Sequence, residues 1–218
     1  DQGQVVKVKD VARVELGAKN MDVSNRFDTK PTVGLAVFLL TGANALETGD
    51  AVTANDRYVF IAQSVDNEGG GLRGDSWPAK GLRWQGVSRR QLSDLREPAP
   101  FEGGRGREGD VLPRSFLVVL EHDEALPDAR LRGLAADGER LYVSSPAESA
   151  IHVYDAESMT PVARWSVERP DKLALDHDGR VWALQRPAAA DRPWRAVRFT
   201  HEGEPSAELV FDPQVRPT

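Results

Sequence analysis

The segment that decides the fold is LRGLAADGERLYVSSPAESAIHVYDAESMTPVARWSVER, residues 131–169. Short runs of β-branched, aromatic and other apolar residues alternate in it with polar turn residues, a pattern typical of strands joined by hairpins. Asp137-Gly138 marks the first of these turns and residues 146–149 mark the second. The segment therefore predicts a complete four-stranded antiparallel sheet, with strands at 134–136, 141–143, 151–154 and 162–167.

The pattern returns in residues 171–213, DKLALDHDGRVWALQRPAAADRPWRAVRFTHEGEPSAELVFDP. Asp178-Gly179 follows Asp137-Gly138 by 41 residues (178 − 137), and Arg180-Val181-Trp182 matches Arg140-Leu141-Tyr142. A period near 40 residues with four strands per repeat is typical of a propeller blade. One such sheet cannot cover both of its faces, so we expect the repeats to stack on one another.

A third, longer copy is predicted over residues 50–126, with strands at 52–54, 58–61, 83–87 and 115–120. Two insertions enlarge it, at 65–80 and at 93–113. Loops this long are uncommon unless they are functional or mobile. We expect both insertions to gather on one face of a propeller, where ligands bind.

The phrase apolar-x-Asp-Gly-x-apolar-aromatic-apolar resembles the NHL-like and YVTN-like propellers, and this resemblance covers about residues 50–218. It implies blades at about 50–126, 131–169 and 171–213, without the Trp-Asp pair of WD40 repeats. Three blades cannot close the usual ring of four to eight. We therefore expect the first and last sheets to expose edges.

The N-terminal stretches VKVKDVARVELGAKN (6–20) and RFDTKPTVGLAVFLLTGANALET (26–48) closely resemble the periplasmic porter domain of RND hydrophobe/amphiphile efflux permeases. The resemblance covers residues 3–49 and implies a short α/β porter-subdomain fragment, with strands over 4–16 and 31–40 and a helix beginning at 45–51. The family's transmembrane helices and intramembrane acidic residues have no counterpart here. The fold class is thus mainly β: a partial β-propeller of about three four-stranded blades at 50–218, preceded by a porter fragment at 1–49.

Composition narrows the possible functions of the 218 residues. The net charge of −6 argues against nucleic-acid binding, and the absence of Cys excludes disulfides, thiolate zinc sites and Cys nucleophiles. No apolar run approaches the roughly 18–20 residues of a membrane span. The N-terminus has no signal-peptide pattern and no Met, which indicates a chain internal to a longer product, or a fragment.

Candidate catalytic and metal-binding motifs are sparse. The four His (122, 152, 177 and 201) show no convergent spacing. Asp176-x-Asp178-Gly179 begins like a calcium loop but lacks the later ligands, so a hairpin turn explains it better. Gly103-Gly104-Arg105-Gly106 lacks the strand and Gly-Lys-Ser/Thr ending of a phosphate loop. We predict no catalytic residue, no metal site and no cofactor.

Trp and Arg residues cluster in the long repeat, and such residues commonly anchor binding surfaces. A possible binding surface therefore consists of Trp77, Arg83, Trp84, Arg89 and Arg90. The alternative interpretation places Trp84 in the core of the blade and leaves the Arg side chains in solvent.

These patterns predict a non-catalytic propeller fragment that acts as a binding module or scaffold, fused to a piece of an RND permease. The join near 48–52 is either a gene fusion or a sequence-assembly artefact. The expected partner is a protein or small molecule on the loop face, and no membrane span is expected in this chain. One alternative is a component of a membrane multidrug efflux transporter, and another is an NHL-type enzyme such as a lyase. The compartment stays open, and it is periplasmic or membrane-associated if the N-terminal resemblance governs.

Overall fold

The computed structural model describes residues 26–27, 30–31, 52–66, 77–106, 114–189 and 191–212. The chain forms two compact units, Asp1–Phe38 and Leu39–Thr218. In the first unit, β1 (Arg26–Phe27) pairs antiparallel with β2 (Lys30–Pro31). Most of the strands expected at 4–16 and 31–40, and the helix expected at 45–51, lie outside the described residues. The domain boundary at 49/50 and the blade limits stay predictions.

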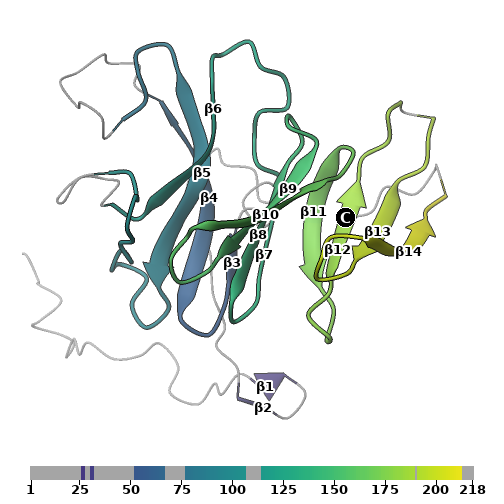
Figure 1. The fold of residues 1–218 in the computed structure, drawn as a ribbon, viewed down its shortest axis with the longest axis horizontal. Coiled ribbons are helices and arrows are strands. Elements are labelled where there is room, and N and C mark those ends of the chain that lie inside the picture. Colours follow the sequence, from purple (N-terminus) through teal and green to yellow (C-terminus); the bar gives the residue numbers. More distant parts are fainter. Residues whose placement is uncertain are drawn as a thin grey trace, which may run out of the picture. The chain divides into compact units, whose positions relative to one another are not determined.

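The second unit contains three four-stranded antiparallel sheets, and their strands follow one another in chain order (Figure 1). None of the described residues is helical. The mainly β fold class predicted from the repeats is therefore confirmed.

The first sheet consists of β3 (Val52–Ala54), β4 (Tyr58–Asp66), β5 (Arg83–Gln91) and β6 (Phe116–His122). The second consists of β7 (Gly133–Ala136), β8 (Arg140–Ser145), β9 (Ala150–Asp155) and β10 (Pro161–Ser166). The third consists of β11 (Pro170–Leu175), β12 (Val181–Gln185), β13 (Arg195–Phe199) and β14 (Pro205–Val210).

The same side-chain cap closes the first hairpin of each four-stranded sheet. Oδ1 of Asn55, Asp137 and Asp176 each accepts two backbone N–H groups from the turn that follows it. Such Asx turns let a short polar side chain replace a strand partner where the chain reverses. The matching residue of Asp137 is therefore Asp176, and the predicted alignment of Asp137-Gly138 with Asp178-Gly179 is wrong by two residues. Because side chains alternate between the two faces of a strand, an alignment error of two residues leaves every side chain on its correct face. The error therefore does not hide the repeat.

The two insertions leave opposite ends of the first sheet, so the prediction that they gather on one face is wrong. Asp66 pairs with Arg83 at one end of the β4–β5 ladder, and Tyr58 pairs with Gln91 at the other. The first insertion joins β4 to β5 at the end that carries Asp66 and Arg83. The second insertion joins β5 to β6 at the end that carries Tyr58 and Gln91. Successive connections in an antiparallel sheet must alternate ends.

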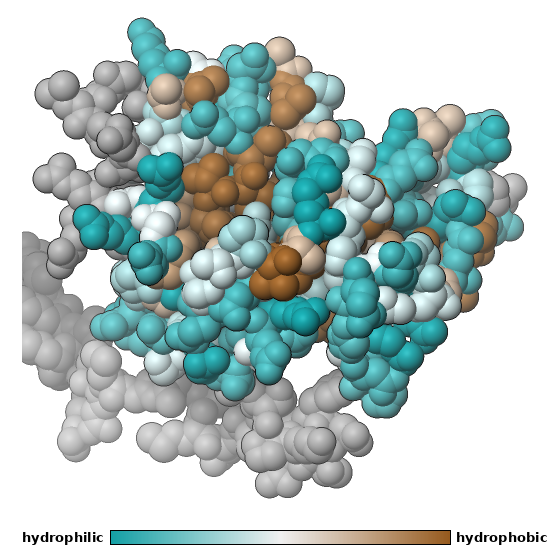
Figure 2. Space-filling model, in the orientation of Figure 1, coloured by the Kyte–Doolittle hydropathy of each residue, from teal (hydrophilic) through white to brown (hydrophobic). Residues whose placement is uncertain are grey.

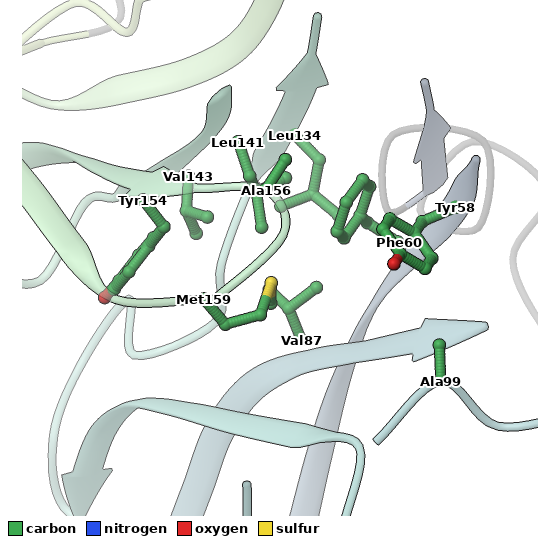
Figure 3. Close-up of a cluster of buried hydrophobic side chains, with 10 residues drawn as sticks. All are labelled: Tyr58, Phe60, Val87, Ala99, Leu134, Leu141, Val143, Tyr154, Ala156 and Met159. Atoms are coloured by element: carbon green, nitrogen blue, oxygen red, sulfur yellow. The ribbon is translucent and has the colours of Figure 1, made fainter. Parts of the chain in front are cut away.

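Two apolar clusters hold the sheets together. One lies between the first and second sheets and includes Phe60, Val87, Leu141 and Val143, as Figure 3 shows. The other lies between the second and third sheets and includes Tyr142, Ile151, Val153, Trp165, Val181 and Phe199. Consecutive residues Leu141 and Tyr142 enter different clusters because a strand alternates its faces. The second sheet is therefore covered on both faces.

The first strands of the three sheets are neighbours: β7 contacts both β3 and β11. Gly133 in β7 permits this approach, because a Cβ there would lie 2.5 Å from the carbonyl oxygen of Asp171 in β11. Ser144 Oγ donates to that same oxygen at 2.6 Å. First strands side by side and sheets stacked face to face are the arrangement expected for part of a propeller.

Candidate functional site

The described residues form an open polar groove at the end of the first sheet where the first insertion begins and ends. Its volume is about 330 Å³. We call this surface the polar groove. Strands β4, β5 and β6 supply one wall, and the connection from β6 to β7 supplies the other. The lining residues are Ser64, Arg83, Gln85, His122, Glu124, Leu126, Asp128, Ala129, Arg130 and Arg132.

A buried amide organises the strand wall of the polar groove. Gln85 Nε2 lies 2.9 Å from Ser64 Oγ and 3.0 Å from His122 Nε2. Because an amide nitrogen only donates, His122 Nε2 accepts here, and its Nδ1–H is left to donate to the carbonyl of Asp123. These contacts hold the His122 ring in one orientation, with Nε2 toward Gln85 and Nδ1 toward the carbonyl of Asp123. The three side chains therefore present fixed hydrogen-bonding groups rather than freely rotating ones.

Charged pairs line the mouth of the polar groove. Arg83 Nη2 lies 2.5 Å from Glu124 Oε1. Asp128 is shared, because its carboxylate lies 3.5 Å from Arg132 Nη2 and 3.2 Å from Arg186 Nη2. All of these side chains are at least partly exposed, so each pair contributes little to stability. The lining holds three Arg against two acidic residues, which leaves an excess of positive charge.

Arg89 is the most deeply buried charged side chain of the predicted binding surface, with 3% of its surface exposed. Its Nε donates to the carbonyl of Ala99 at 3.1 Å, and Nη2 donates to that of Pro100 at 2.9 Å. Nη1 donates across the sheets to the carbonyls of Ala156, at 3.0 Å, and Glu157. Burial lowers the pKa of Arg89 from its usual value. Arg89 therefore joins the first sheet to the second and does not face solvent.

The five residues of the predicted binding surface are not brought together on one face. Arg83 and Arg89 lie on the face of β5 that includes Val87 and meets the second sheet, whereas Trp84 and Arg90 alternate to the other face. Trp84 is buried and stacks on Phe116, and Trp77 packs against this pair. The interpretation of Trp84 as blade core is confirmed, and that of solvated Arg side chains is wrong for Arg89. A binding role for the set stays a prediction.

The His residues are dispersed. His177 is 90% exposed beside Asp178, and His152 Nε2 lies 2.9 Å from Glu148 Oε2. Within the described part of the chain, no group of three or more His, Asp or Glu side chains could hold a metal ion. His122 and Gln85 in the polar groove were missed as a pair, because their 37-residue separation leaves no local signal.

The fold and the groove define a mainly β protein built from propeller-like sheets. Its N-terminal residues 1–57 match the model of the AcrB/AcrD/AcrF family. This confirms the resemblance of that stretch to RND efflux permeases. In the parts that the structure describes, no helix has both the length and the apolarity to cross a membrane.

Curated relatives align with the same N-terminal stretch. The chain is 56% identical over 52 residues to multidrug export protein AcrF of Escherichia coli strain K12, and the match covers 24% of this chain and 5% of that protein. It is 54% identical over 50 residues to the toluene efflux pump membrane transporter TtgB of Pseudomonas putida, and this match covers 23% of this chain and 5% of that protein. The chain thus spans about a twentieth of the length of these relatives.

Two solved structures share a distant likeness with this chain. Hydrazine synthase of Kuenenia stuttgartiensis gives a TM-score of 0.40 at 14% identity, with 80% of this chain and 53% of that chain covered. Glutaminyl cyclase of Myxococcus xanthus gives a TM-score of 0.29 at 8% identity, with 71% of this chain and 67% of that chain covered.

Proposed function

We propose that residues 52–212 act as a non-catalytic binding module and that the polar groove takes a small anionic ligand. The observation that carries this proposal is that Arg83, Arg130 and Arg132 line one open groove together. A volume of about 330 Å³ lies at the small end of the range for ligand sites.

The chemistry of the lining favours a carboxylate or phosphate group. Arg presents a planar fork of N–H donors that matches both anions. The pairs Arg83–Glu124 and Arg132–Asp128 are partly exposed and contribute little free energy, so a ligand anion can replace the protein carboxylate at small cost. Gln85 holds the strand wall in place through its contacts with Ser64 and His122, so the Arg side chains supply the donors for the anion and the wall loses little entropy on binding.

Calorimetric titration with inorganic phosphate and with malonate, at constant ionic strength, tests this proposal. We expect saturable binding of at least one anion to the unmodified chain and a loss of about tenfold or more in affinity for Arg132→Met. Arg164→Met is the matched control, because Arg164 is exposed on β10 and donates to the carbonyl of Glu148 away from the groove. Absence of binding, or equal losses in both variants, would contradict the proposal.

A second candidate rests on a different observation, the match of residues 1–57 to an efflux family. In this case the segment belongs to a membrane multidrug efflux transporter, and the propeller-like sheets are an addition to it. Long-read sequencing of the gene across codons 40–60, with its flanks, tests this candidate. Reading frames for transmembrane helices continuous with this chain would support it. A frame that breaks between the two parts in independent isolates would end it.

A further inference from the structure

The outer face of the third sheet carries apolar side chains that are only partly covered. Leu184, Ala196 and Leu209 lie in register across β12, β13 and β14, and Leu209 is 56% exposed. The cluster that joins this sheet to the second sheet takes Val181 and Phe199 from the opposite face. At the right of Figure 2 the surface is mostly hydrophilic, with small apolar patches among the polar side chains. We call the face that carries Leu209 the open face.

The open face repeats a face that the second sheet buries. Because the Asx caps align Asp137 with Asp176, the ladders place Trp182 at the position of Tyr142 and Leu209 at that of Trp165. In the second sheet, Tyr142 and Trp165 have ring centres 5.6 Å apart and pack beneath the third sheet. The open face therefore holds the positions that receive a following sheet elsewhere in the molecule.

Arg198 gives the open face a specific polar anchor. It pairs with Trp182 across β12 and β13, as Arg89 pairs with Phe60 in the first sheet. Arg89 is covered by the second sheet and donates to carbonyls of the turn between β9 and β10. Arg198 holds the same register position, with its guanidinium 5.8 Å from the Trp182 ring centre. Its Nε donates to Ser206 Oγ at 3.1 Å, and among the described residues no turn covers it as the β9–β10 turn covers Arg89.

The far side of the first sheet differs from the open face, because the chain covers it with its own side chains. Trp84 is 5% exposed and Phe116 is fully buried there. Trp77 packs on them, and the guanidinium of Arg105 lies 5.8 Å from the Trp84 ring centre. Among the described residues, side chains therefore cover the far side of the first sheet, whereas the open face is only partly covered.

We propose that the open face is a docking surface for a further four-stranded antiparallel sheet of the same repeat. The turn between the third and fourth strands of that sheet would supply backbone carbonyls to Arg198. The occupant is a sheet because the two interfaces already present in the stack are formed by the same register positions, and the open face continues that series. This inference is independent of the polar groove.

A tethered sheet tests the proposal in the full chain. A copy of residues 123–169 is joined after Asp212, because the original copy already covers Phe60 and Arg89 at the equivalent positions. Leu209→Lys is then introduced into the extended and the original chain, and unfolding in urea is measured for all four proteins. We expect the extended chain to unfold in one transition, with Leu209→Lys lowering its folding equilibrium constant roughly tenfold more than in the original chain.

The matched control is Val162→Lys, since Val162 is 53% exposed on β10 and lies on no face that the appended sheet would cover in this arrangement. We expect equal effects of this change in both chains. Separate unfolding of the appended sheet, or equal effects of Leu209→Lys in both chains, would overturn the proposal. A dimer of the original chain in sedimentation velocity that Leu209→Lys dissociates would also overturn it, because the face would then bind a second copy.

Discussion

The guanidinium carbon of Arg89 lies 4.3 Å from the ring centre of Tyr58, and the two side chains together join the first sheet to the second. Tyr58 donates from its hydroxyl to Glu157 Oε1 at 2.9 Å, while Arg89 donates to the carbonyl of the same residue. A buried cation is retained only where its donors are satisfied. The relationship therefore makes the contact between the sheets specific, in addition to the apolar cluster beside it.

Removing Arg89 should destabilise this contact strongly. Arg89→Met keeps much of the apolar volume but leaves buried carbonyls, among them that of Ala156, without their donor. We expect a loss of about 3 kcal/mol in the free energy of unfolding, measured by urea denaturation. The control is Arg90→Met, since Arg90 donates to the carbonyl of Arg96 in an exposed contact and should cost at most about 0.5 kcal/mol. Similar losses in the two variants would refute a special role for Arg89.

Gly203 is expected to be intolerant of a side chain. Its φ is +91°, and a Cβ there would lie 2.3 Å from Cδ1 of Trp165, which belongs to the cluster between the second and third sheets. Gly203→Ala should cost about 2–4 kcal/mol, from backbone strain and displacement of the indole. Gly81→Ala separates the two causes, because Gly81 has φ +83° but no atom within 4 Å of a built Cβ. Denaturation followed by Trp fluorescence measures both, and equal costs would show that strain alone acts.

Stability should fall at high pH because of the buried Tyr side chains. Burial raises the pKa of Tyr154 to about 12, and the charge of Glu148 adds to this rise. Burial also raises the pKa values of Tyr58 and Tyr142. Since the unfolded chain loses these protons first, the stabilisation is complete below about pH 10 and is lost as pH rises toward about 12.

Urea midpoints at intervals between pH 9 and pH 12 measure this pH dependence. Tyr154→Phe should flatten the decrease, by about 2–3 kcal/mol across the interval, because Phe has no proton to lose. A decrease of the same size in Tyr154→Phe would show that other groups cause it.

The Asx caps should contribute similar amounts to each sheet. Asp137→Ala removes acceptors for the N–H groups of Glu139 and Arg140, and Asp176→Ala does the same for the third sheet. We expect a loss of about 1 kcal/mol in the free energy of unfolding for each, as for other side-chain caps. Glu139→Ala is the control within the same turn and should change stability little. Unchanged stability in Asp137→Ala would contradict the assigned role.

Much of the sheet structure could be read from local patterns. The strands of the second sheet were placed within about one or two residues, because alternation and turn chemistry depend on neighbours in the chain. The alignment of the second and third sheets was wrong by two residues at Asp176, and it still assigned each side chain to the correct face of its strand. The groove was harder to predict, since Ser64, Gln85 and His122 meet only across three strands and two insertions.

The sequence by itself determined the strands, their turns, the repeat and the efflux-like N-terminal stretch, because each depends on residues close together along the chain. Only the tertiary structure decided that Arg89 is buried, that Trp84 stacks on Phe116 in a core, and that the open face of the third sheet matches a buried one. The physical reason is that burial depends on which sheet covers a face. That covering sheet is distant in sequence, so alternation shows which side chains share a face but not what lies upon it.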